Sequence, residues 1–169
     1  AIEGARTRHA PALARVRLSV RFYGAASALA ILYRSAADGR VEQALAQDPA
    51  GPFARRALLD GRGETIESAL GPSSIALPSG ELCAVLPDRE SFIRFHCYDV
   101  AFDRWIDLSA QAFDVELGPQ TRGSAALAFH RYRDATGAAI GGDPSRGALY
   151  LAFTQPESSA ALFTDNPHF

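Results

Sequence analysis

The sequence predicts an all-β protein, an antiparallel β-barrel or sandwich with little helix. Three observations predict this class. Residues 14–23 alternate apolar and polar side chains at period two, which is typical of a half-buried strand. Short apolar runs bounded by Gly, Pro, Ser or Asp then recur along the chain, as strands separated by turns do. Helical spacing is weak, and residues 41–46 fit no more than one or two helical turns.

The composition predicts a single domain without a membrane segment. With 169 residues and 47% hydrophobic content, we expect an N-terminal arm over residues 1–13 and one domain over residues 14–169. The net charge of −2 excludes a global attraction to nucleic acid or to an anionic membrane. No apolar run reaches the length that spans a bilayer, so membrane insertion is not expected. The chain contains no Met, which predicts a processed start, by removal of the initiator or by cleavage from a precursor.

The first half of the chain is expected to hold two strands and a long loop. After the strand at residues 14–23, the apolar run at residues 29–33 predicts a second strand that is buried on both faces. Asp38-Gly39 marks a tight turn, because Gly tolerates the positive φ that such turns demand. From residue 41 to residue 70 the pattern loosens, which predicts a long irregular excursion.

The second half of the chain is richer in strands. We predict strands at residues 74–77, 81–86, 92–98, 124–132 and 147–154. Residues 103–108 fit a short strand or a turn of helix, and residues 160–164 form a last apolar segment. The expected total is six to eight strands.

A weak internal repeat raises a second architecture. Residues 81–105 can be laid over residues 28–53, and residues 148–169 over both, as a hydrophobic hairpin followed by an aromatic residue. The offsets are uneven and no signature residue recurs. Three propeller-like blades are therefore an alternative to one barrel.

Motifs for catalysis, metals and cofactors are missing from the sequence. The four histidines, His9, His96, His130 and His168, lack the spacing that places two ring nitrogens on one metal. No Gly-x-Ser-x-Gly elbow exposes a nucleophile, and the Gly-rich stretch from Gly137 to Gly147 has no lysine of a phosphate loop. We therefore predict no catalytic residue, no metal, no cofactor and no enzyme activity.

The two cysteines face each other in the expected hairpin. Folding the segment from Leu82 to Tyr98 about Arg89-Glu90 places Cys83 directly opposite Cys97. A bridge forms only at suitable geometry, and Cys packs readily as a small hydrophobe. Two reduced, buried thiols are favoured over a disulfide.

One face of the first strand is basic. Arg15, Arg17 and Arg21 alternate with its apolar side chains, and Arg6, Arg8 and His9 extend the patch. These side chains could contact phosphates or the carboxylates of a neighbouring subunit, or they could form a solvated strand face. Arg131-Tyr132-Arg133-Asp134 forms a similar patch with the same two interpretations.

The order of the segments resembles the jelly-roll capsid proteins of picorna-like RNA viruses, including plant secoviruses. Residues 14–27 (ARVRLSVRFYGAAS) are similar to the fourth strand of that barrel, and residues 28–35 (ALAILYRS) to the fifth. Residues 77–87 (LPSGELCAVLP), followed by an aromatic-bearing segment, are similar to the seventh. The last two strands and the exit correspond to residues 123–130, residues 147–154, Leu162-Phe163 and Asp165-Asn166-Pro167.

This resemblance implies a structural capsid subunit that is released by polyprotein cleavage. Such a subunit assembles with sibling coat proteins into an icosahedral shell around RNA, and the particle can meet a host receptor. It is found in the virion, and in the host cytoplasm during assembly. Arg15, Arg17 and Arg21 would then contact neighbouring subunits or RNA. The first strands of the barrel are not found in this chain, so another segment or chain would supply them.

Two alternatives come from other functional classes. The three-blade interpretation predicts a carbohydrate-binding propeller unit that dimerises into a closed ring of six blades, with Tyr98, Trp105 and Phe53 lining the sugar sites. A hydrolase on a β-sandwich would need an acid–base pair such as Asp103 and Glu81 in one cleft.

Overall fold

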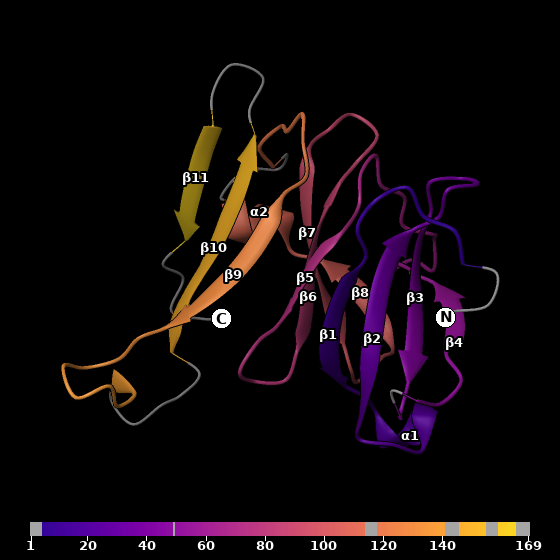
Figure 1. The fold of residues 1–169 in the computed structure, drawn as a ribbon, viewed down its shortest axis with the longest axis horizontal. Coiled ribbons are helices and arrows are strands. Elements are labelled where there is room, and N and C mark those ends of the chain that lie inside the picture. Colours follow the sequence, from indigo (N-terminus) through magenta and orange to yellow (C-terminus); the bar gives the residue numbers. More distant parts are fainter. Residues whose placement is uncertain (1–4, 49, 114–117, 141–145, 155–158, 165–169) are drawn as a thin grey trace.

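The structure, a computed structural model, describes residues 5–48, 50–113, 118–140, 146–154 and 159–164, the last of these by their backbone. Three antiparallel sheets follow one another along the described chain (Figure 1). The first sheet contains β1 (Ala12–Arg17), β2 (Ser27–Arg34), β3 (Val41–Ala46) and β4 (Ala54–Ala57). The second sheet contains β5 (Ser73–Ala76), β6 (Leu82–Pro87), β7 (Ile93–Asp99) and β8 (Arg104–Asp107). The third sheet contains β9 (Ala126–Arg131), β10 (Gly147–Thr154) and β11 (Ser159–Thr164).

Each sheet is a meander in which every strand pairs with its neighbour along the chain. The initial strands of the three sheets, β1, β5 and β9, contact one another in that order. Figure 1 shows the second sheet between the other two, and in the first and third sheets the later strands lie progressively farther from it. Sheets that contact one another through their first strands are also a feature of β-propellers, in which the first strand of each blade lies nearest the central axis.

The predicted all-β, antiparallel class with little helix is confirmed. Among the described strands, the sheets do not close into a barrel, and the strand order lacks the crossover connections that a jelly roll would need. The weak repeat found in the sequence corresponds to the three sheets, since its three copies begin at β2, β6 and β10.

Two hydrophobic cores lie between the sheets, and the second sheet contributes residues to both. The core between the first and second sheets includes Val16, Leu32, Leu82, Leu86 and Trp105. The core between the second and third sheets includes Val85, Phe95, Leu149, Leu151 and Phe153. Because neighbouring side chains on a strand point to opposite faces, β6 contributes to both cores, and all six of its residues are buried.

The first predicted strand, residues 14–23, is too long and begins too late. β1 starts at Ala12, inside the expected arm, and ends at Arg17, after which Val20–Tyr23 forms the short helix α1. Gly24 ends this helix at φ 67°, where its amide donates to the carbonyl of Val20 at 2.8 Å. Val20 and Phe22 are therefore exposed, although the period-two pattern predicted that they are buried.

The expected irregular excursion over residues 41–70 contains β3 and β4, so that prediction is wrong for these two strands. The alanine-rich sequence of β3 has helical propensity, but pairing with β2 and β4 on both sides makes it a strand. β2 also differs from expectation, because Leu29 and Ile31 on one face are only half-buried.

The hairpin of β6 and β7 has the predicted register, but its cysteines are oxidised. Cys83 pairs with Cys97 across the two strands, with the Cα atoms 4.1 Å apart, and the sulfurs form a disulfide. The expectation of reduced thiols is wrong. Directly opposed positions on antiparallel strands bring the two side chains close enough for the bond.

Two short helices complete the described part of the chain, and neither is long and apolar enough to cross a membrane. The second, α2 (Ser109–Phe113), packs against β7. Its first residue, Ser109, is buried and accepts a hydrogen bond from the Phe95 amide at 2.8 Å. This contact fixes the chain as it leaves the second sheet.

Candidate functional site

A cleft of about 570 Å³ lies where the end of β1 meets the second sheet. Its apolar wall is formed by Leu18, Val100, Ile106 and Leu108. Its charged members are Arg17, Glu81 and Asp99. An apolar wall with a few charged groups is the usual composition of a site for a small polar ligand.

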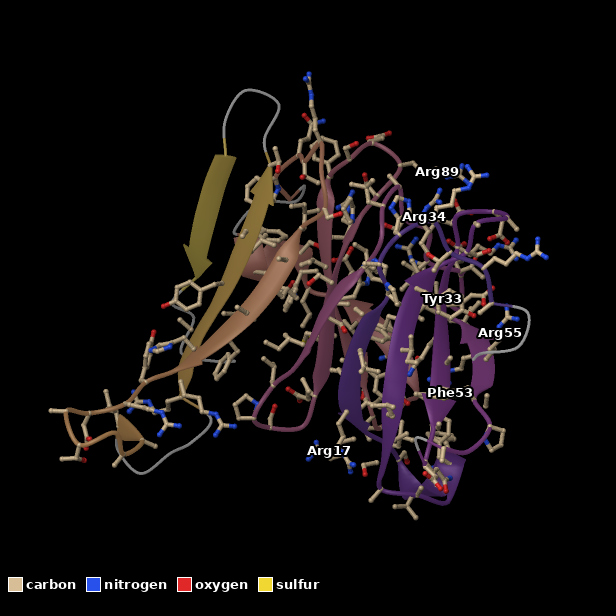
Figure 2. The ribbon with its side chains drawn as sticks, in the orientation of Figure 1. Arg17, Tyr33, Arg34, Phe53, Arg55 and Arg89 are labelled. Atoms are coloured by element: carbon tan, nitrogen blue, oxygen red, sulfur yellow. A yellow bond between two sulfur atoms is a disulfide. The ribbon has the colours of Figure 1, made fainter. Side chains whose placement is uncertain are left out.

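A turn between β5 and β6 positions Arg17 and Glu81. The Arg17 amide donates to the carbonyl of Gly80 at 3.2 Å. Gly80 has φ 88°, and a Cβ built on it would lie 3.5 Å from the Cβ of Arg17, so the side-chain stem of Arg17 lies beside this turn. Glu81 follows directly and accepts a hydrogen bond from the Ser79 hydroxyl at 3.1 Å. Figure 2 shows Arg17 at the lower end of the first sheet.

The third charged group of the cleft, Asp99, lies at the end of β7, next to the turn that leads to β8. Asp99 accepts a hydrogen bond from the Ala101 amide at 2.9 Å and lies 3.8 Å from Nε of Arg104. These two contacts hold the carboxylate in place at the end of β7. The cleft therefore combines one guanidinium and two carboxylates that come from three different turns or strand ends.

Tyr98 lies behind the cleft as part of a half-buried polar cluster. Its hydroxyl and that of Tyr23 both donate to Oδ1 of Asp103, the latter at 2.6 Å. Arg56 donates to Oδ2 of Asp103 at 2.8 Å and lies over both tyrosine rings, 5.3 Å from the Tyr23 centroid and 5.8 Å from that of Tyr98. Burial and the hydrogen bonds to Asp103 raise the pKa of Tyr23 and of Tyr98 above the ordinary value.

The structure separates the three predicted arginines. Arg15 and Arg17 share one face of β1, and Arg15 donates to the Ser27 hydroxyl at 3.4 Å. Arg21 lies on α1, where its guanidinium is 5.8 Å from the ring centroid of Phe22. One continuous basic strand face is therefore not formed, and Arg17 alone of the three lines the cleft.

The three aromatic residues expected at sugar sites do not form an exposed platform. Tyr98 and Trp105 are only 2% and 1% exposed, because both belong to the core between the first and second sheets. Phe53 lies just before β4 and is half-buried, away from the cleft lining. Of the three, Tyr98 contributes to the cleft, as part of its wall.

The acid–base pair suggested for a hydrolase is not brought together. Glu81 lines the cleft, whereas Asp103 is bound by Arg56 and two tyrosine hydroxyls in the cluster behind it. The structure therefore does not place these two carboxylates in one cleft.

A second polar groove, of about 940 Å³, lies under the N-terminal segment and was not predicted. The Tyr33 hydroxyl and the Arg55 guanidinium both donate to Oε2 of Glu42, the latter at 2.7 Å. Burial and the bond to Glu42 raise the pKa of Tyr33 to about 12. Figure 2 shows Tyr33 and Arg55 toward the outer side of the first sheet. The available signal was the strand period, which places residues 33, 42 and 55 on one face once β3 and β4 are known.

Comparison with solved structures identifies a protein of similar fold. The fold resembles that of a known lectin. The chain is similar to a fucose lectin from Kordia zhangzhouensis, solved in complex with methyl-fucoside, at a TM-score of 0.57 and 10% sequence identity over 93% of each chain. At this identity the similarity concerns the fold alone. No family model matches the chain, and no curated protein matches it. The lectin gives no support to the capsid resemblance.

Proposed function

We propose that the chain is a lectin-like module that binds carbohydrate in the cleft between its first and second sheets, without catalysis. The observation that carries the proposal is the composition of that cleft, with Arg17, Glu81 and Asp99 around an apolar wall. Sugars present hydroxyl groups for charged donors and acceptors, and C–H faces for apolar side chains. The fold similarity to a lectin bound to methyl-fucoside supports the same class of ligand.

Each charged group has a defined part in this proposal. Arg17 offers a planar fork of N–H donors to neighbouring sugar oxygens, while the Glu81 carboxylate accepts from hydroxyl groups. Asp99 is already held by the turn between β7 and β8, so its free lone pairs are pre-oriented. Leu18 and Ile106 supply the apolar contact for the ring.

The test is binding of methyl-fucoside and of an array of other glycans, measured by calorimetry and microarray. Arg17→Ala and Glu81→Gln should each weaken binding about tenfold or more, which corresponds to about 1.4 kcal/mol. Arg62→Ala removes an exposed arginine from a loop outside the cleft and should leave binding unchanged. Absence of binding to every glycan, or equal binding by all three variants, would reject the proposal.

The capsid function stays a prediction. The strand order and the fold similarity give it no support. Its partners, sibling subunits and RNA, would show themselves by assembly into particles, which electron microscopy of the purified chain with candidate siblings would detect.

A further inference from the structure

Each end of the row of sheets has a face on which no other described sheet packs. On the first sheet, the N-terminal segment lies over one part of this face, at Tyr33 and Glu42. On the first sheet this face includes Leu13, which is 61% exposed, and the half-buried Leu29 and Ile31, with the exposed Arg15 opposite Leu29. The three apolar residues are adjacent, because Leu13 pairs with Ile31 in the register of β1 and β2. We call this surface the leading face.

The outer face of the third sheet carries four alanines together with the rings of His130 and Tyr150. Leu127, Phe129, Leu149, Leu151 and Phe153 point toward the second sheet and belong to its core. Alternation along each strand therefore turns a set of alanines to the opposite side, with Tyr150 among them. These alanines are Ala126, Ala128, Ala148 and Ala152. We call this surface the trailing face.

The same pattern of small against large residues occurs inside the molecule, at the junction of the first and second sheets. The face that the first sheet turns to the second has alanines on its first two strands, namely Ala12, Ala14, Ala28 and Ala30, alongside Val16 and Leu32. The second sheet meets them with Leu82, Leu86 and Tyr98. Small residues on one face and large ones on the next allow the two sheets to interdigitate.

We propose that the trailing face of one copy of this chain packs on the leading face of a second copy, so that two chains close a ring of six sheets. The faces are complementary in the same way as the internal junction, with alanines on β9 and β10 against Leu13, Leu29 and Ile31. β9 would then contact β1 of the second copy, continuing the series of contacts from β1 to β5 and from β5 to β9. Such a contact is head to tail and occurs twice in the ring.

The first test is the mass of the chain in solution, measured by size-exclusion chromatography with light scattering. A mass of two chains is expected. Leu13→Arg and Ala128→Asp each place a charge in both junctions and should shift the mass to that of one chain. Val20→Arg and Ala110→Asp place the same charges at exposed positions on α1 and α2 and should leave the dimer intact.

A mixture of the two interface variants separates the ring from other dimers. One chain carrying Leu13→Arg and one carrying Ala128→Asp form one junction with paired charges and one native junction, so mixing should restore the dimer. If the leading faces packed on each other, Ala128→Asp alone would remain dimeric, and this result would overturn the proposal. A monomeric wild-type chain would also overturn it.

Folding of the variants is checked separately by circular dichroism. Should a charged variant unfold, Leu13→Cys and Ala128→Cys chains are mixed, and a covalent heterodimer is expected; its absence counts against the junction. The proposal does not depend on the ligand of the cleft. A dimer that binds no glycan rejects the carbohydrate function alone, and a monomer that binds glycan rejects the ring alone.

Discussion

Asp103 connects two sheets through a single carboxylate. It lies in the turn between β7 and β8 at φ 54°, a conformation that a non-glycine residue adopts at some cost. Tyr23 of α1 and Arg56 of the first sheet donate hydrogen bonds to it, and so does Tyr98 of the second sheet. Burial by itself would raise the pKa of Asp103, but the hydrogen bonds from these three residues outweigh burial and lower it below the ordinary value.

This pKa shift predicts a loss of stability in acid. A carboxyl group whose pKa is lower in the folded state stabilises the fold fully above its unfolded value, about 3.8, and the effect is lost as the pH falls through the folded value. Asp103→Asn should lower the free energy of unfolding at pH 7 by roughly 2 kcal/mol, because charged hydrogen bonds are lost.

Urea denaturation at pH 7 and at pH 3 checks this prediction. The destabilisation caused by Asp103→Asn should be smaller at pH 3 than at pH 7. Glu90→Gln, at an exposed position in the turn between β6 and β7, is the matched control and should change neither value by much. A difference between Asp103→Asn and the wild type that is independent of pH would contradict the assignment.

At the scale of single elements, the disulfide joins β6 and β7 over a sequence separation of 14 residues. Closing a loop of this length restricts the unfolded chain, and the expected stabilisation is about 3 kcal/mol. The double variant Cys83→Ala, Cys97→Ala should therefore have a free energy of unfolding that is lower by that amount, measured by urea denaturation. Reduced wild-type protein should behave in the same way. Reaction of the folded, unreduced chain with a thiol label would show that the bond is absent.

Strands with clear local patterns were predictable, and those that depend on neighbours were not. The hairpin of β6 and β7 follows from two apolar runs around a turn, and its register placed Cys83 opposite Cys97. β3 lacks such a signal, since Val41 is its only β-branched residue and Gln43 points into the core. Its strand conformation comes from pairing between β2 and β4, which only the folded sheet provides.

In the candidate cleft, too, single residues could be predicted from the sequence, but their arrangement could not. Arg17 and Tyr98 were each singled out from the sequence, for different functions, and both line the cleft. These two residues lie together because the first sheet packs against the second at the turn that contains Gly80. No local sequence pattern predicts this packing. Glu81 was noted only as half of a catalytic pair, and Asp99 was not noted. Sequence patterns can indicate which residues lie on a face, but not which faces meet.

For the whole molecule, the second sheet couples both cores. Leu82 belongs to the core shared with the first sheet and Ile93 to the core shared with the third, and both are fully buried. Leu82→Ala and Ile93→Ala should each destabilise the protein by roughly 2–5 kcal/mol, because each leaves a cavity. Both variants should still unfold in one transition, because neither core persists without the shared sheet.

Thermal unfolding followed by far-ultraviolet circular dichroism and by the fluorescence of Trp105 checks this coupling. Trp105, the one tryptophan of the chain, reports on the core between the first and second sheets, whereas the dichroism signal reports on all sheets. Coincident curves are expected for Ile93→Ala, although its cavity lies in the other core. A fluorescence transition at an unchanged temperature, with an earlier loss of dichroism, would mean that the sheets unfold independently.

The position of the disulfide makes the shape of the cleft depend on redox conditions. Cys97 is a member of the cleft lining, so the disulfide anchors one residue of the wall to β6. Reduction would release the strand on which Asp99 and Tyr98 lie from its covalent tie to β6. Bonds of this kind persist in oxidising compartments and are opened by cytosolic reductants. The cleft thus keeps this shape where thiols are oxidised, and its ligand affinity should respond to a reducing agent before the fold is lost.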